Sequence, residues 1–84
     1  MIPDALLDAV IAEAARQEGV EPDGVRVLTV ERRTWPNGAL GCPRAGEMYI
    51  QVVQQGYRVV LAIGTQEPDY RITDDGTVRR CGRL

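Results

Sequence analysis

The sequence predicts an α+β fold in which one N-terminal amphipathic helix packs on an antiparallel meander sheet of four to five strands. Apolar residues recur at helical spacing over residues 3–18, apolar and polar residues alternate over much of residues 25–81, and turn residues separate the alternating runs. The 84 residues are expected to form one domain, residues 1–84, with a small core that lacks phenylalanine.

The helix is expected over residues 3–18. Pro3 suits a first helical position, because its missing N–H group would have no partner there in any case. Gly19 suits the position just after the last turn, and Pro22 prevents the helix from continuing. The side that packs on the sheet is expected to be its apolar stripe: Leu6, Leu7, Val10, Ile11, Ala14 and Ala15.

Five alternating or β-branched runs predict the strands, at residues 25–33, 47–54, 57–63, 69–73 and 77–81. In the first run the alternation changes phase near Val27, which indicates either a strand covered on both faces or a β-bulge. Gln55-Gly56 is expected to form a two-residue hairpin between the second and third strands. Asp75-Gly76 is expected to form another hairpin before the last strand.

A long loop over residues 34–46 is the candidate binding surface. It contains the only tryptophan, Trp35, and one of the two cysteines, Cys42. Loops on rigid scaffolds often carry recognition, and tryptophan and arginine are typical contact residues. Trp35, Leu40 and Arg44 are therefore the candidate binding residues. The alternative is that Trp35 and Leu40 simply fill the open end of a small core.

The composition argues against an enzyme. Histidine and serine are both absent, which excludes a serine nucleophile and removes the commonest general base and metal ligand. Two cysteines cannot form a closed zinc site by themselves, so we expect no metal and no other cofactor. The expected partner is another protein, and a second copy of the chain could also bind through an open sheet edge or face.

Charge and hydropathy bear on two further questions, whether the chain binds nucleic acid or a membrane and in which compartment it is found. The net charge is −2, with −5 on residues 1–24 and +3 on residues 25–84. All ten basic residues are arginines, which suit an anion site, but few aromatic residues and no basic motif accompany them, so nucleic acid is not expected. No apolar run could span a membrane and no signal peptide is recognisable, so the chain as written is expected to be cytoplasmic, or secreted or periplasmic if a leader was removed.

The state of the two cysteines is open on the residues alone. A bond between Cys42 and Cys81 would close a loop of about 40 residues and stabilise the fold by about 4 kcal/mol. The alternative is two separate buried thiols. A thiol redox role for Cys42, activated by Arg44, is a weaker hypothesis, because no resolving cysteine lies near it in the sequence.

Three motifs carry a family resemblance: W-P-N-G-A-L-G-C-P at residues 35–43, G-Y-R-V-V-L at residues 56–61, and the late Cys81. In these motifs the chain resembles a small family of uncharacterised bacterial proteins with no assigned function. The resemblance covers residues 25–81 and implies that Cys42 and Cys81 form a disulfide.

Asp69-Tyr70-Arg71 and the hairpin sequence at residues 75–78 are similar to the tail of small peptidase inhibitors of the potato type I kind. That likeness gives an alternative function, in which the Leu40–Arg44 region mimics a peptidase substrate. A disulfide beside Leu40 would make such a loop rigid and lower the entropic cost of binding.

Overall fold

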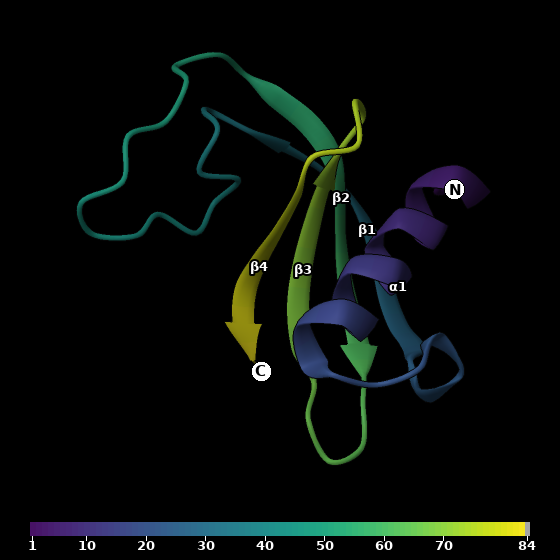
Figure 1. Ribbon diagram of the computed structural model, residues 1–84. Helices are drawn as coiled ribbons and strands as arrows, with labels where there is room; N and C mark the ends of the chain where they lie inside the picture. The colour runs from purple at the N-terminus through teal and green to yellow at the C-terminus, as the bar shows by residue number, and fades with distance from the viewer. Residues whose placement is uncertain (84) are drawn as a thin grey trace.

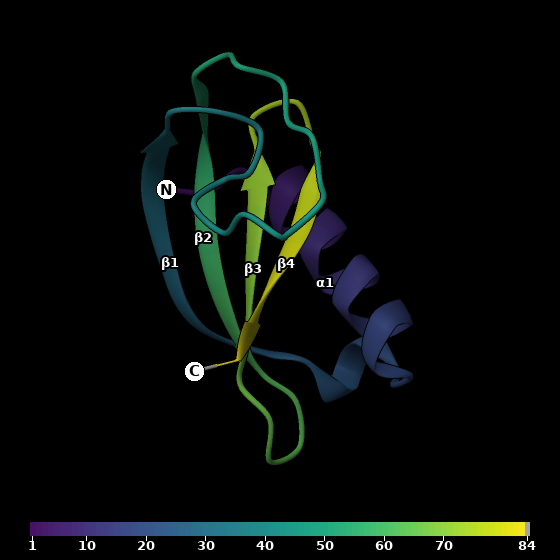
Figure 2. The same ribbon diagram turned by 90° about the vertical axis from the view of Figure 1, so that its left-hand side faces the viewer.

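A four-stranded antiparallel sheet lies between one helix and one long loop. The computed structural model describes residues 1–83, with residue 83 described by its backbone only. The elements are α1 (Asp4–Glu18), the 3-10 turn η1 (Pro22–Gly24), β1 (Arg26–Trp35), β2 (Gln54–Ala62), β3 (Pro68–Thr73) and β4 (Val78–Arg83). The strands pair in the order β1-β2-β3-β4. Helix α1 covers one face, and the loop that joins β1 to β2 lies on the other side (Figure 1, Figure 2). The predicted α+β fold class is confirmed.

Helix α1 ends at the predicted residue but begins one residue later than predicted, because Pro3 is the extended residue before the first turn and not the first helical residue. The carbonyl of Pro3 accepts hydrogen bonds from the N–H groups of Leu6 and Leu7, which form the first turn. Gly19 follows the last turn in the left-handed conformation, at φ 71°, which costs glycine little. Its N–H group donates to the carbonyl of Ala15 and closes the helix.

Strands β1 and β2 pair along the whole length of β1. The register shifts between Val27 and Thr29, so the β-bulge alternative for this strand is confirmed. A bulge inserts one extra residue and moves the following side chains to the other face, which explains the change of phase in the sequence. Leu28, at the bulge, is 44% exposed.

The strand predicted over residues 47–54 and the hairpin predicted at Gln55-Gly56 are wrong. Residues 47–53 belong to the loop, and Gln55 and Gly56 both lie inside β2. Gly56 stands opposite Thr73 of β3. A Cβ atom on Gly56 would overlap the carbonyl of Ile72 and come within 2.7 Å of the Thr73 Cα atom. The glycine therefore permits a close approach of two strands and does not form a turn.

The hairpin predicted at Asp75-Gly76 is confirmed, and it joins β3 to β4. The N–H group of Gly76 donates to the Thr73 carbonyl at 2.9 Å, and that of Thr73 donates to the Thr77 carbonyl at 3.0 Å. Gly76 has φ 94°, in the region that favours glycine. This turn fixes the position of Asp75 at the tip of the hairpin.

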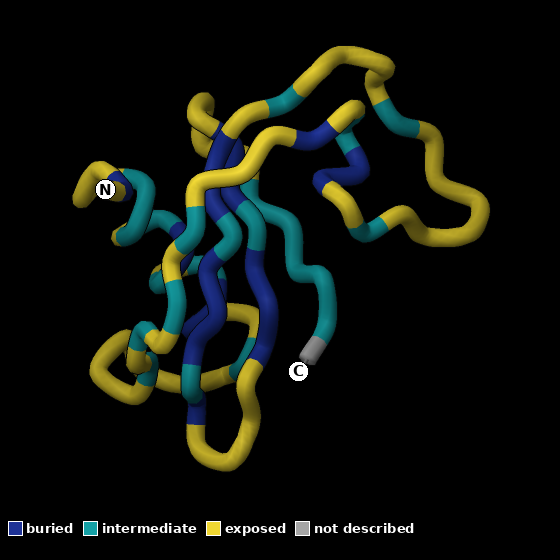
Figure 3. The backbone as a smooth tube through the Cα atoms, turned by 180° about the vertical axis from the view of Figure 1, so that it is seen from behind, coloured by how far each residue is buried: buried dark blue, intermediate teal, exposed yellow. Residues whose placement is uncertain are grey.

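The main core lies between α1 and the sheet, and Figure 3 shows its buried residues along the middle strands. Its buried members are Ile2, Val10, Ala14, Tyr57, Val59, Leu61, Ile63, Tyr70 and Ile72.

The Tyr70 hydroxyl donates to Glu18 at 3.1 Å, and Arg80 donates to the same carboxylate at 2.9 Å. Burial, then the hydrogen bond to Glu18, raises the pKa of Tyr70 to about 12. The hydroxyl is therefore protonated at neutral pH and ties the end of α1 to the sheet.

Candidate functional site

A disulfide holds the long loop (residues 36–53) to the far strand of the sheet. Cys42 is bonded to Cys81 of β4, and their Cα atoms are 5.7 Å apart. This is the pairing that the family resemblance implies. Since both cysteines are used, Cys42 is not a free thiol, and the redox hypothesis loses its nucleophile. The loop begins at β1 and ends at β2, so the bridge to β4 carries it across the sheet.

Two arginines of the sheet hold the loop at further points. Arg71 of β3 donates to the Leu40 carbonyl at 2.7 Å. Arg79 of β4 donates to the Cys42 carbonyl and to the Glu47 carboxylate, each at 2.8 Å. Their side chains are only 15% and 13% exposed. These two guanidinium groups bind the chain's own loop, so they do not form the anion site that the arginine content suggested.

The candidate binding residues Trp35 and Leu40 are buried. Trp35 is 6% exposed and Leu40 is 2% exposed, together with Ala39 at 3%. A Cβ atom on Gly41 would come within 3.0–3.1 Å of the Trp35 ring, which shows how closely the loop lies on it. This burial agrees with the alternative in which Trp35 and Leu40 fill the open end of a small core.

Arg44, the third candidate binding residue, connects the loop to β4. Its guanidinium donates to the Arg80 carbonyl of β4 and lies 3.6 Å from Glu47. Its side chain is 51% exposed, so part of it is open to solvent. The structure thus brings Trp35, Leu40, Cys42 and Arg44 together where the loop lies on the sheet, on the side away from α1 (Figure 2).

Replacing Leu40 by alanine is expected to lower the free energy of unfolding by about 2–3 kcal/mol, since it leaves a cavity in a buried site. Thermal unfolding followed by circular dichroism measures the change. Met48→Ala is the matched control, because Met48 belongs to the same loop but is 98% exposed; it should change stability by less than about 0.5 kcal/mol. An unchanged melting temperature for Leu40→Ala would contradict the burial and make Leu40 a contact residue again.

The second half of the loop, residues 47–53, is here named the outer arm. It exposes four apolar side chains: Met48 at 98%, Ile50 at 62%, Val52 at 59% and Val53 at 61%. Within residues 1–83, the main-chain N–H groups of residues 48–53 donate to no other protein group. The alternating sequence that predicts a strand here belongs to a segment that has no strand partner within the described chain.

The outer arm is nevertheless held in place. The N–H group of Gly38 donates to the Ile50 carbonyl at 2.9 Å, and a Cβ atom on Gly38 would come within 2.9 Å of the Ile50 side chain. The Tyr49 hydroxyl accepts a hydrogen bond from the Arg44 N–H group and donates to the Arg44 carbonyl at 3.0 Å. The Arg79 guanidinium lies 5.3 Å from the centre of the Tyr49 ring. These contacts therefore hold the outer arm at Tyr49 and Ile50, in the middle of the segment that carries the exposed side chains.

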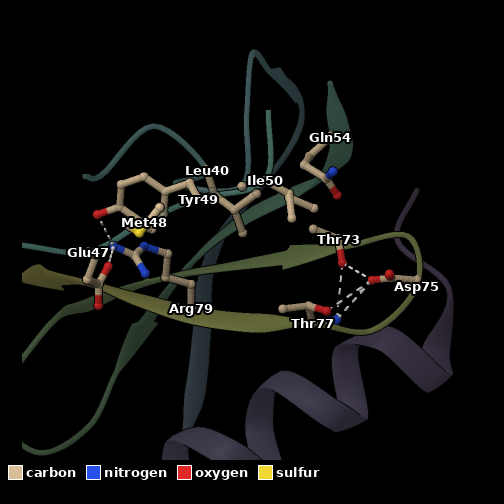
Figure 4. Close-up of a pocket in the computed structure, with 11 residues that line it drawn as sticks. Leu40, Glu47, Met48, Tyr49, Ile50, Gln54, Thr73, Asp75, Thr77 and Arg79 are labelled. Carbon is tan, nitrogen blue, oxygen red and sulfur yellow. Dashed lines mark hydrogen bonds and ion pairs between the residues drawn. The ribbon is translucent and has the colours of Figure 1, made fainter. Parts of the chain in front are cut away.

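A cleft of about 440 Å³ lies between the outer arm and the β3–β4 hairpin (Figure 4). Its lining combines apolar groups of the loop with polar groups of the hairpin: Gly38, Leu40, Glu47, Met48, Tyr49, Ile50, Gln54, Thr73, Asp75, Thr77 and Arg79. The hydrogen bond from Arg79, then that from Tyr49, lowers the pKa of Glu47, so the Glu47–Arg79 ion pair persists at neutral pH. The cleft can therefore accept a side chain with both an apolar and a polar part.

Within residues 1–83, no group of three or more histidine, cysteine, aspartate or glutamate side chains could hold a metal ion. No helix of that part of the chain is both long and apolar enough to cross a lipid bilayer.

Comparison with known proteins gives one result. A family model, described as a domain of unknown function (DUF8738), matches residues 7–81. No curated protein and no solved structure gives a significant match. The matched range contains β1, β2, β3, the first part of β4 as far as Cys81, and the long loop with Cys42. The description of the family names no activity.

Proposed function

The chain belongs to the DUF8738 family, a domain of unknown function, and we propose that it is a non-catalytic module that binds an extended segment of a partner protein along its outer arm. The observation that carries the proposal is the display of four exposed apolar side chains on one anchored segment. Single exposed apolar residues are ordinary on protein surfaces, but a contiguous group of them is typical of an interaction site.

The recognition mode that fits the arm is strand addition. Its main-chain N–H groups from Met48 to Val53 have no partner within the described residues. The carbonyl groups of an extended peptide can therefore accept hydrogen bonds from them. The strand-like sequence of the arm supports this mode, because alternating apolar residues are selected where a chain is paired and half-buried. Within the described residues the outer arm is not paired with a strand and its apolar side chains are exposed. An added strand would pair with it and bury those side chains.

The attachments of the loop support the same proposal. A segment that is already fixed loses little conformational entropy when it binds, which improves affinity without any new contact. The disulfide, Arg71 and Arg79 all hold the loop without covering the four exposed side chains. The rigid first half of the loop is therefore interpreted as a support, and the outer arm as the surface that it presents.

This proposal moves the contact surface from residues 35–46 to residues 47–53. The peptidase-inhibitor alternative needs Leu40 and Arg44 on display, whereas Leu40 is buried and Arg44 binds the Arg80 carbonyl. No geometry favours that alternative, so it is not pursued as a second function. The disulfide supports a secreted or periplasmic location for the module, because such bonds persist in oxidising compartments.

Selection from a random peptide library displayed on phage tests the proposal. The immobilised protein is expected to enrich peptides rich in β-branched and other apolar residues. The double variant Met48→Ser/Ile50→Ser should bind the enriched peptides about tenfold more weakly or worse, the loss typical of central contact residues. Leu28→Ser is the matched control, since Leu28 is an exposed apolar residue on β1 outside the loop. No enrichment, or equal binding by the double variant, would overturn the proposal.

A further inference from the structure

The cleft beside the outer arm contains one charge that the protein does not neutralise. Of its three charged residues, Glu47 and Arg79 form an ion pair at 2.8 Å and cancel each other. Asp75 has no cationic partner among the described side chains, those of residues 1–82. Figure 4 shows Asp75 at the hairpin end of the cleft, with Thr73 and Thr77 beside it. The cleft thus has a net negative charge.

Hydrogen bonds fix the Asp75 carboxylate and leave one of its oxygens open. Oδ1 accepts from the Thr73 hydroxyl, from the Thr77 N–H group at 3.3 Å and from the Thr77 hydroxyl at 3.2 Å. Oδ2 accepts none of the hydrogen bonds among the described residues. The bonds from Thr73 and then Thr77 lower the pKa of Asp75, so the group is ionised at neutral pH.

The neighbouring Asp74, unlike Asp75, has a cationic partner. Both of its carboxylate oxygens accept hydrogen bonds from Arg32, at 2.6 and 2.9 Å. Asp74 is therefore neutralised within the protein, and it does not line the cleft. The two adjacent aspartates of one turn have different surroundings, which makes Asp74 a control for Asp75.

We propose that the cleft takes a lysine or arginine side chain of the bound segment, with Asp75 as its counter-charge. The proposal rests on the proposed function, since the outer arm positions the segment whose side chain enters the cleft. Lysine and arginine carry an aliphatic stem and a charged head, and they commonly lay the stem on apolar groups while the head reaches a polar one. The apolar side chains of Leu40 and Ile50 line the cleft for the stem, and Asp75 meets the head.

The same phage library tests the cleft, with three forms of the protein: wild type, Asp75→Asn and Asp74→Asn. Asparagine keeps a side-chain oxygen that can accept the hydrogen bonds from Thr73 and Thr77, so the turn is preserved while the charge is removed. Wild type and Asp74→Asn are expected to enrich apolar peptides that contain a lysine or arginine at one fixed position. Asp75→Asn is expected to enrich apolar peptides without that preference.

A titration of one enriched peptide measures the effect directly. Replacing its lysine or arginine by methionine should weaken binding to wild type about two- to fivefold, as for a partly exposed ion pair. The same peptide change should have little effect on Asp75→Asn, and a double-mutant cycle gives the coupling between the two groups. Added salt should reduce that coupling.

The outcomes separate the two proposals. Apolar peptides without a basic position, or a basic preference that survives in Asp75→Asn, would overturn the role of the cleft and leave the outer arm as the binding surface. No enrichment by any of the three forms would overturn both the cleft and the proposed function.

Discussion

Replacing Cys42 and Cys81 by alanine is expected to lower the free energy of unfolding by about 4 kcal/mol. The two residues are 39 positions apart, and the bond restricts the unfolded chain over that distance. Since a domain of this size is stable by only about 5–15 kcal/mol, the loss is a large part of the total. The melting temperature should fall by roughly 15–30 °C, as measured by circular dichroism.

A second signal separates release of the loop from general unfolding. Trp35 is the only tryptophan and lies buried beneath the loop, so its fluorescence reports on the cover. Reductant added to the wild type below its melting temperature should shift the Trp35 emission to longer wavelength, while the far-ultraviolet circular dichroism of the sheet stays. The double alanine variant is the control and should not respond to reductant. A stability loss under about 1 kcal/mol would show that the bond does not restrain the chain in this way.

Gly56→Ala is expected to destabilise the fold by about 3 kcal/mol, the upper part of the range for overpacking. The added Cβ atom would overlap the Ile72 carbonyl and come within 2.7 Å of the Thr73 Cα atom. Both are backbone groups of β3, so the rotation of a side chain cannot relieve the overlap. The paired strands β2 and β3 must therefore move apart at this position. Chemical denaturation in guanidinium chloride measures the change as a shift in midpoint.

Gly24→Ala is the matched control for this substitution. A Cβ atom on Gly24 would lie 3.7 Å from the Val20 Cβ atom, an ordinary contact distance. Its φ is not positive, so alanine meets no backbone strain there. The variant should stay within about 0.5 kcal/mol of the wild type. If Gly56→Ala were equally mild, the two strands would have to be further apart than the structure places them.

Much of the candidate site was visible in the sequence, but its parts were assigned wrongly. The sequence predicts the loop with Trp35 and Cys42, and it predicts residues 47–54 as an extended segment with alternating apolar residues. Leu40 was expected either on display or in a small core, and only the structure decided for the core. The sequence gives no signal for Arg79, because its neighbours in the chain do not show that the Cys42 carbonyl and Glu47 lie beside it.

The sequence by itself determined the features that depend on neighbouring residues. Pro3, Gly19 and the helical spacing between them defined α1, and Asp75-Gly76 defined a turn, since backbone conformation there follows from local sterics and hydrogen bonds. The change of phase at Val27 likewise indicated the bulge.

Only the tertiary structure decided which extended segments are paired. Alternation shows that a chain is extended and half-buried, but the partner of a strand comes from a distant part of the sequence. Residues 47–53 therefore looked like a strand and are an exposed arm, while Gly56 looked like a turn and lies inside β2. The position of Gly56 is set by the backbone of β3 opposite it, and the role of the outer arm is set by the absence of any such strand within the described chain.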